Sequence, residues 1–561
     1  MGPVANHLPP SGVLACGAFG RYDPDRVGAI AAALGPATTV AHSDERSILA
    51  LDRPPVRWQG SRQAGIGWTE RVEGVAGEKF DSWADAATVG AVSGLVIEGR
   101  GRYLHTSVSG ALPVYYRQDA DAVYFATRID PLVTSAPGRL SIDWDAWAAM
   151  LTLDYPLGDR TPFSEIRALG PFTTLAFRRG RARATDKRWP WAEVEPGLGV
   201  ERGSEELLDR LRGGVARLPA GAIACQLSGG WDSRVCLGLL AEQRREDTFA
   251  LTVDHDGGTD REIVIAAEIA DILRIPHEVA TGAPDGYWSD MVTRTERVDY
   301  QLVRPPWRVP EIEPLLRVSA PVIDGLAFDA LAMPGERFFT RDAIAANGSD
   351  AAARGLWRRL KAMQAKRGPS ALDPKLARAL WASSRRQFLA ASEPYRGNPN
   401  RLPLTFYRTR LARGIALSVH RILGTDLPMV TPLMDDEVVR ALLVIRPEEK
   451  YGGHVYYSLF EALEPALAAV PTTSVGEPPP SGRPLPKRSQ TPAVADAYAE
   501  RLRSGPLAPF VRNRINRILS RHRAGKRYPR VPRAVLGPAV FSLWHERYRD
   551  RLREVDPKDV L

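Results

Sequence analysis

The chain has 561 residues, and by the usual domain size of roughly 100–200 residues it should hold two or three domains, of which we expect two. Hydrophobic residues make up 44% of the chain, charged residues 25%, and the net charge is +9, an ordinary globular composition that excludes disorder of the whole chain. Three cysteines without a CxxC pair exclude a disulfide framework and a zinc cage.

The first third of the chain alternates short apolar runs with turn residues, as in Tyr103–Ser107, Val114–Arg117 and Ala122–Thr127. This rhythm predicts a mostly antiparallel sheet domain with few helices. The segment 189–205 is rich in Pro, Gly and charge and has little periodicity, so we place a linker within it. The first predicted domain therefore covers residues 1–190.

The chain after the linker alternates predicted strands and helices. In order, these are a helix over Glu205–Arg217, a strand over Ala222–Leu227, a helix over Arg234–Gln243, a strand over Thr248–His255, a helix over Thr259–Leu273 and a strand over Pro321–Ile323. Thr259 and Glu262 fit a capping box. This alternation predicts a parallel sheet covered on both faces, with ligands outside the carboxyl ends of its strands. From Leu356 the pattern is mainly helical, and the second predicted domain covers residues 204–561.

A glycine turn joins the first of these strands to its helix, and we call residues 228–233 (SGGWDS) the phosphate loop. Gly229 and Gly230 let the backbone approach a ligand and turn its N–H groups inward, while the following helix presents its positive end. Ser228 and Ser233 add hydroxyl donors. The loop therefore predicts an anion site suited to pyrophosphate.

Asp232 stands inside this loop, where its carboxylate would repel a bare phosphate. Its presence is consistent with phosphate binding chiefly when a divalent cation bridges it to a nucleotide. We therefore expect Mg²⁺ as a cofactor together with the nucleotide.

The SGGWDS string resembles the SGGxDS pyrophosphate loop of the asparagine synthetase superfamily, whose members split ATP between its α and β phosphates. Further stretches extend the resemblance in the same order as in the family. Asp324–Asp329 lies where the family has SGEGSD, Thr431–Asp435 resembles its PFLD, Asp260–His277 resembles its DExxxAxxxAxxLGxxH helix, and Gly110–Tyr116 with Val123–Thr127 resembles its GxxPLYY…FAS sheet.

The resemblance implies an α/β fold. Its N-terminal part would be a glutaminase-like (Ntn-type) antiparallel sheet sandwich, and its C-terminal part an adenine nucleotide alpha hydrolase-like (PP-loop) parallel-sheet domain with a helical end. It implies ATP and Mg²⁺ as cofactors, with Asp232 and Asp329 as metal carboxylates and Asp232 also catalytic. It adds Leu227, Val253 and Gly325 to the phosphate-loop residues Ser228, Gly229, Gly230, Asp232 and Ser233 as nucleotide contacts.

A lysine near the C-terminal part steadies developing charge in this family. Lys487 lies roughly where that lysine falls, and Lys450 is the other candidate, although either could be a solvated surface lysine, Lys450 more so. We expect His277 to be a packed residue rather than a ligand. Trp231 is expected to shield the nucleotide or to pack on the sheet.

Two departures separate this chain from asparagine synthetases. Glutamine-dependent members use an N-terminal cysteine whose own amine activates the thiol, whereas position 2 here is Gly2 and fifteen residues precede Cys16. We therefore expect an inactive glutaminase-like domain in which Cys16 is an ordinary buried residue. Leu326 stands where asparagine synthetases have a glutamate and β-lactam synthetases a tyrosine, so the attacking amine should come with the substrate.

Intramolecular amide formation then fits best, and we favour the lasso peptide macrolactam synthetase (lasso cyclase) branch. A β-lactam-type synthetase, an asparagine synthetase using glutamine or ammonia, a tRNA-modifying ATPase and a non-catalytic nucleotide- or peptide-binding scaffold are the alternatives. The segment 501–533 holds eleven Lys or Arg and no acid. It is either a solvated face or a dock for an acidic peptide or partner.

The expected partners are thus a peptide substrate and a leader peptidase or precursor-recognition protein. Nucleic acid is not expected, because no zinc finger or aromatic-interleaved RNA motif accompanies the basic segment. No apolar run approaches the roughly 20 residues of a membrane span, and no signal peptide is apparent. We therefore expect a cytoplasmic protein without a membrane span.

Overall fold

The fold is that of a computed structural model of the chain. The described residues are 10–553 apart from 73, 76–77, 187, 255–259, 284–285, 306–308, 319–320, 327, 334–347, 366–367, 473–490, 514, 516 and 518–532. Among these residues, no helix combines the length and the apolar character needed to cross a bilayer, in agreement with the sequence.

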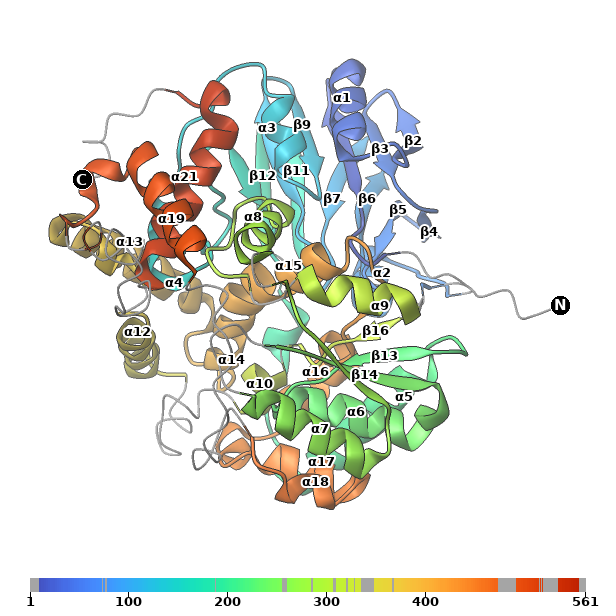
Figure 1. The fold of residues 1–561 in the computed structure, drawn as a ribbon. Helices are drawn as coiled ribbons and strands as arrows, with labels where there is room; N and C mark the ends of the chain where they lie inside the picture. Colours follow the sequence, from blue (N-terminus) through green and yellow to red (C-terminus); the bar gives the residue numbers. More distant parts are fainter. Residues whose placement is uncertain are drawn as a thin grey trace.

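The first third of the chain forms two six-stranded antiparallel sheets that pack as a sandwich (Figure 1). The first sheet, ordered β10-β8-β9-β1-β3-β2, consists of β1 Ala15–Gly20, β2 Thr39–Asp44, β3 Ser47–Leu51, β8 Tyr115–Asp119, β9 Ala122–Ala126 and β10 Ile166–Ala168. The second, ordered β12-β11-β7-β6-β5-β4, consists of β4 Val56–Gln59, β5 Ala64–Thr69, β6 Val92–Glu98, β7 Gly101–His105, β11 Thr173–Arg178 and β12 Arg181–Asp186. The predicted antiparallel sheet is confirmed, and β7, β8 and β9 lie close to the three strands expected from the sequence.

The two sheets share one apolar core, because alternate side chains of each strand point toward the opposite sheet. Trp68 and Leu104 from the second sheet meet Phe19 and Phe125 from the first, and all four are fully buried or nearly so. Helices cover the outer face of the first sheet and make this region less purely β than predicted. They are α1 Pro24–Leu34, α3 Asp130–Thr134, α4 Trp144–Leu153 and α21 Leu536–Tyr548, while α2 Trp83–Thr88 packs on the second sheet.

The predicted parallel sheet is also confirmed, with five strands ordered β15-β14-β13-β16-β17. They are β13 Ile223–Gln226, β14 Thr248–Val253, β15 His277–Ala280, β16 Val322–Ile323 and β17 Met429–Val430. Helices α6 Trp231–Arg244 and α7 Arg261–Leu273 lie on one face, and α9 Ile312–Val318 lies on the other (Figure 1). Strands β15 and β17 were not among the predicted elements, whereas the two-residue β16 lies within the strand expected over Pro321–Ile323.

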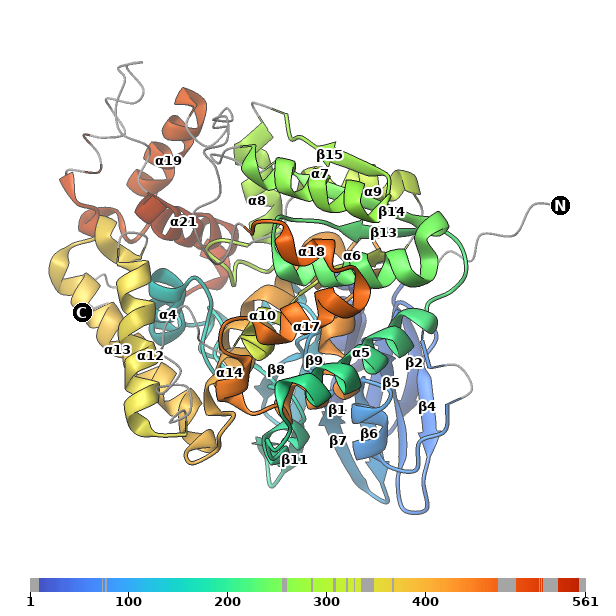
Figure 2. The same ribbon diagram turned by 90° about the horizontal axis from the view of Figure 1, so that it is seen from below.

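The rest of the described chain is mainly helical, as expected. Its helices are α5 Val200–Ala216, α8 Tyr287–Arg297, α10 Phe328–Ala332, α12 Asp350–Gln364, α13 Pro374–Ser392, α14 Arg401–Phe406, α15 Ala416–Ser418, α16 Asp436–Leu443, α17 His454–Leu463, α18 Ala466–Ala469 and α19 Pro492–Ser504. Seen from below, α12 and α13 lie beside α4 of the first third (Figure 2).

A buried helical stretch of residues 401–423, the bridging helix, joins the sandwich to the parallel sheet. It consists of α14, a π-helical segment Tyr407–Ile415, α15 and a second π-helical segment Val419–Leu423. Arg421 is 1% exposed and donates to the backbone carbonyls of Val13 and Thr127 in the sandwich. One apolar core cluster therefore runs from the second sheet of the sandwich through the bridging helix to the parallel sheet.

The segment predicted as a linker is partly buried. Trp189 and Trp191 are 4% and 1% exposed, and both rings pack against Tyr407 of the bridging helix. Helix α5 then begins at Val200, earlier than the sequence pattern indicated. The Pro and Gly content of this stretch is typical of a linker, but its two tryptophan rings are packed in the core.

Candidate nucleotide site

The carboxyl ends of β13 and β16 mark the point where the parallel sheet reverses its strand order. The chain runs from β13 through β14 to β15 on one side, and then continues with β16 and β17 on the other. In open parallel sheets, ligands bind at such a switch point. The phosphate loop follows β13 and Asp324–Leu326 follows β16, so two sequence motifs meet at this edge.

The two serines of the phosphate loop hold its backbone. The Ser228 N–H donates to Ser233 Oγ at 3.0 Å, and the Gly230 N–H donates to Ser228 Oγ at 3.1 Å. Gly230 is the N-cap of α6 and provides no side-chain cap. The positive end of α6 is therefore directed at the loop, where an anion is favoured. The helix end thus favours an anion beside the loop, and the pyrophosphate site and the nucleotide stay predictions.

Asp232 and Asp329 lie next to each other, although they are far apart in the sequence. Each stands in the first turn of a helix, α6 and α10 respectively. The Tyr456 hydroxyl donates to Asp232 Oδ1 at 2.5 Å. Burial first, and the Asp329 charge second, raise the pKa of the Asp232 carboxyl well above its ordinary value. The two carboxylates predicted to bind metal are thus brought together.

This pair fits a divalent cation. Two carboxylates in one buried site repel each other, and a cation between them would compensate both the repulsion and the lost hydration. Asp324 also acts on Asp232 through its charge. Among the described residues, no group of three or more His, Cys, Asp or Glu side chains forms a complete metal cage. Phosphate oxygens and water would supply the remaining ligands, as is usual for Mg²⁺.

Gly325 allows the loop after β16 to pack against the first turn of α6. A Cβ at this position would lie 2.7 Å from the Asp232 carbonyl carbon and 2.8 Å from the Ser233 nitrogen. A larger residue would therefore push the two loops apart. Leu326 follows and is 4% exposed, so a buried apolar side chain without an ionisable group stands beside this turn.

Leu227 and Val253, the other predicted nucleotide contacts, stand at the carboxyl ends of neighbouring strands. The Leu227 carbonyl accepts from Thr252 Oγ1 at 2.9 Å, and Thr252 Oγ1 also bonds His277 Nε2 at 2.7 Å. His277 is thus a packed residue, as predicted. Leu227 is buried and Val253 is half-buried at the end of β14.

Trp231 packs on helix α17, a contact that was not predicted, and its expected shielding of the nucleotide stays a prediction. Its ring centroid lies 5.0 Å from that of Tyr456 and 5.4 Å from that of Tyr457, both on α17. Gly453, just before α17, allows this approach, because a Cβ there would lie 2.4 Å from the Trp231 ring. Trp231 therefore holds α17 in the place from which Tyr456 reaches Asp232.

Arg234 is a structural residue of the site that the sequence analysis missed. It is 0% exposed, and its guanidinium donates to the carbonyls of Leu467, Val470 and Pro471, each at 2.8 Å. These bonds tie α6 to α18 and to the turn that follows it. A charged residue on an otherwise apolar helix, directly after the phosphate loop, was the signal in the sequence.

The predicted capping box of Thr259 and Glu262 stays a prediction, because Thr259 lies outside the described residues, but Glu262 also contacts the phosphate loop. Its Oε1 accepts from the Gly229 N–H of the phosphate loop at 2.8 Å. Asp260 is the N-cap of α7 and makes no side-chain cap bond, and Thr259 lies outside the described residues. A carboxylate thus faces the loop, which the capping pattern did not indicate because the partner is distant in sequence.

The two lysine candidates differ in outcome. Lys487 lies outside the described residues, so its catalytic role stays a prediction. The surface position expected for Lys450 is wrong, because this residue is 0% exposed and its Nζ donates to the carbonyls of Leu331 and Leu442. These carbonyls lie near the C-terminal ends of α10 and α16, which attract a cation. Lys450 therefore joins α10, the helix of Asp329, to α16.

Lys450 predicts a specific pH dependence of stability. Burial lowers the pKa of Lys450 to about 7, whereas an unfolded lysine has a pKa near 10.4. Between these values the unfolded chain binds a proton that the folded chain has lost, so the stability contributed by Lys450 rises with pH. The free energy of unfolding from urea titrations should increase more from pH 7 to pH 9 in the wild type than in Lys450→Met. Equal increases would contradict the burial of this amine.

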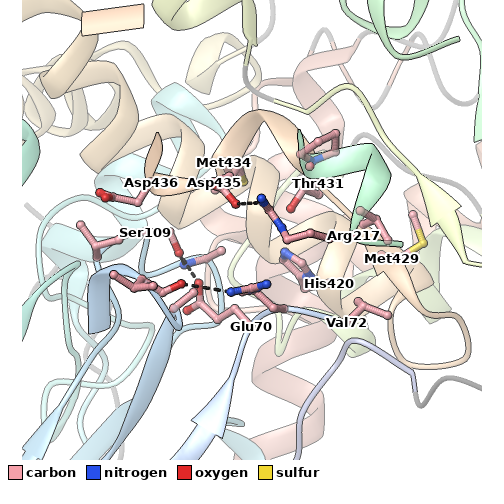
Figure 3. A pocket seen from close by; sticks show the side chains of 18 of the residues that line it. Glu70, Val72, Ser109, Arg217, His420, Met429, Thr431, Met434, Asp435 and Asp436 are labelled. Carbon is pink, nitrogen blue, oxygen red and sulfur yellow. Dashed lines mark hydrogen bonds and ion pairs between the residues drawn. The ribbon is translucent and has the colours of Figure 1, made fainter. Parts of the chain in front are cut away.

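The Thr431–Asp435 motif lines a different cavity, which lies between the sandwich and the parallel sheet (Figure 3). Its volume is about 80 Å³, and Glu70 and His420 are among the residues that line it. Asp435 forms an ion pair with Arg217 at 2.9 Å and caps α16. None of the lining residues in the described part of the chain belongs to the phosphate loop. The motif is therefore structural here.

Cys16 is an ordinary buried residue, as predicted. It stands within β1 and is 0% exposed, and burial raises the pKa of its thiol to about 12. The thiolate is the reactive form of cysteine, so this position is unsuited to nucleophilic attack on glutamine.

Only part of the basic segment 501–533 is described. Arg501 at the end of α19 forms an ion pair with Glu546 of α21, and residues 518–532 lie outside the described residues. Docking of an acidic peptide or partner on this segment therefore stays a prediction.

Comparisons with known proteins give little further guidance. No protein-family model matches the chain, and no curated protein matches it. Among solved structures, NMN synthetase from Francisella tularensis matches with 18% identity over 29% of this chain and 71% of that chain, at a TM-score of 0.18. NH3-dependent NAD synthetase from Campylobacter jejuni matches with 12% identity over 34% of this chain and 97% of that chain, at a TM-score of 0.19. The function is therefore inferred from this chain's own residues.

Proposed function

We propose that the chain is an ATP-dependent, AMP-forming ligase that closes a macrolactam ring in a peptide. An Asp or Glu side-chain carboxylate of the peptide attacks the α-phosphate of ATP, which forms an acyl-adenylate and releases pyrophosphate. The N-terminal amine of the same peptide then attacks the acyl carbon and releases AMP. The observation that carries this proposal is the phosphate loop beside the Asp232 and Asp329 pair at the switch point of the sheet.

The residues at the switch point have separate tasks in this reaction. The N-terminal end of α6 and the N–H groups of the loop hold the leaving pyrophosphate, because oriented backbone dipoles stabilise an anion without reorganisation. Asp232 and Asp329 would hold Mg²⁺, which when bound neutralises phosphate charge. Tyr456 orients Asp232 by its hydrogen bond, and Gly325 keeps the two loops in contact.

Two residues without a reactive group indicate that the attacking amine belongs to the substrate. Cys16 is buried with a raised thiol pKa, and Leu326 cannot transfer a proton. An enzyme with these residues does not release ammonia from glutamine, so the amine has to arrive with the substrate. A peptide N-terminal amine has a pKa near 7.7–8.0 and is already partly neutral, so it needs little help from a base. Closing a flexible ring of about eight residues costs only on the order of 2 kcal/mol beyond a constant.

A peptide substrate implies partners that prepare it. A leader peptidase or a precursor-recognition protein would expose the amine, and the sequence of the basic segment 501–533 has a charge suited to an acidic partner. A β-lactam-type synthetase remains the nearest alternative, since it also uses an internal amine. The scaffold alternative is disfavoured by Asp232, because a buried carboxylate with a strongly raised pKa beside a second carboxylate is typical of functional sites.

ATP–pyrophosphate exchange with candidate peptides tests this proposal. Exchange should require a peptide with an Asp or Glu at the ring position and should disappear when that residue is Asn or Gln. The product should differ from the substrate by the loss of one water, seen by mass spectrometry. A failure to form AMP or pyrophosphate with any acidic peptide would count against ligase activity. Formation of asparagine from aspartate with ammonia or glutamine would replace the cyclase by an asparagine synthetase.

A further inference from the structure

The Glu262 carboxylate accepts a hydrogen bond from one backbone N–H group of the phosphate loop. Among the N–H groups of Ser228, Gly229 and Gly230, those of Ser228 and Gly230 donate to neutral hydroxyls within the loop. The Gly229 N–H instead donates to Glu262 Oε1 at 2.8 Å. The one negatively charged partner of these three donors thus comes from outside the loop, from the first turn of α7.

Two helix ends favour a negative charge at this place. Gly230 is the N-cap of α6, and Glu262 belongs to the first turn of α7, so the positive ends of both helices act on the same carboxylate. Neither N-cap residue makes a side-chain cap bond. The carboxylate is therefore held by the same kind of interaction that binds a phosphate at a helix N-terminus.

A diphosphate and this carboxylate exclude each other. The Gly229 N–H has a single proton to donate, and two anions at hydrogen-bond distance from one donor repel each other strongly in a partly buried site. We propose that Glu262 is an internal competitor for the pyrophosphate position. It fills that position in the empty enzyme, leaves when the β and γ phosphates of ATP enter, and returns as pyrophosphate departs. This inference rests on the proposed function, whose nucleotide site it deepens.

Binding of magnesium pyrophosphate, measured by calorimetry at fixed free Mg²⁺, tests the competitor. Glu262→Ala removes the charge and the acceptor, so its Kd should fall about ten-fold, as expected for the loss of one charged hydrogen-bond competitor. Glu262→Gln keeps an amide oxygen near Gly229 without the charge, so its Kd should fall by less. Glu268→Gln makes the same change of charge at an exposed position of α7 and should leave the Kd unchanged.

Other outcomes separate the competitor from different roles of Glu262. An anchor of the loop would give weaker binding in Glu262→Ala and normal binding in Glu262→Gln, and this result would overturn the inference. A metal ligand would make both variants require more Mg²⁺ for the same Kd, which would overturn it as well. Thermal unfolding of each variant shows that the fold is intact. Tighter pyrophosphate binding in Glu262→Ala would support the competitor on its own. A wild-type protein without exchange activity would in that case contradict only the proposed ligase.

Discussion

Asp232→Asn should make the protein more stable and remove its adenylation activity. Asparagine has the same shape, and its Oδ1 can still accept from the Tyr456 hydroxyl. The substitution removes a buried charge and its repulsion with Asp329, which are the causes of the raised pKa of Asp232. Without that carboxylate the cation has one protein ligand fewer, and exchange activity should fall roughly 10²–10³-fold, the loss typical of a preorganised electrostatic group.

The pH dependence gives this prediction a second signature. Because the pKa of Asp232 is raised in the folded state, the folded chain binds a proton that the unfolded chain has lost. Wild-type stability should therefore fall as the pH rises from the ordinary aspartate pKa near 4 through the folded pKa, and Asp232→Asn should lack this fall. Urea midpoints at pH 5 and pH 8 measure the difference, with exposed Asp209→Asn as the control. Magnesium-dependent exchange at the wild-type rate in Asp232→Asn would exclude this residue from the mechanism.

Arg234→Met should be among the most destabilising single changes in the chain. The guanidinium is fully buried and donates to three carbonyls, one in α18 and two in the turn after it, and two of these bonds are buried. Methionine fills much of the volume but leaves these acceptors without their donor. At about 1–3 kcal/mol for each buried unsatisfied group, the free energy of unfolding should fall by roughly 3–5 kcal/mol.

Two further variants show whether geometry or charge matters at Arg234. Arg234→Lys keeps the charge but cannot span three carbonyls, so its unfolding free energy should fall between those of the wild type and Arg234→Met. Arg245→Met, at an exposed arginine just past the end of α6, should leave the urea midpoint almost unchanged. A small effect of Arg234→Met would mean that the turn after α18 finds other donors and does not depend on this residue.

Local patterns were sufficient to predict the sheets and the phosphate loop. Apolar residues of period two, glycine turns and the order strand, turn, helix around residues 228–233 all act within a few positions of the sequence. The meeting of Asp232 and Asp329 was also predictable, since both follow strands of one parallel sheet and the carboxyl ends of such strands share an edge. The choice of Asp329 itself, however, came from the resemblance of Asp324–Asp329 to a family motif and not from periodicity.

The predictions that failed concern partners brought together only by folding. The contact of Glu262 with Gly229 was missed, because Gly229 belongs to another strand-to-helix turn. Lys450 lies in a charged stretch that predicts a surface position, but its amine donates hydrogen bonds to carbonyls near the ends of two helices. The linker prediction at Trp189 failed for the same reason. A Pro- and Gly-rich sequence does not show that the Trp189 ring packs against Tyr407 in the folded chain.

The bridging helix bears on how such a chain can change over evolutionary time. Its Arg421 is satisfied by two carbonyls of the sandwich, and one apolar core continues across the same boundary. Deletion of the sandwich would leave the Arg421 guanidinium without these two acceptors and would expose the apolar face of the remainder to solvent. The sandwich would thus persist as an obligatory part of the folding unit, whatever chemistry it carries.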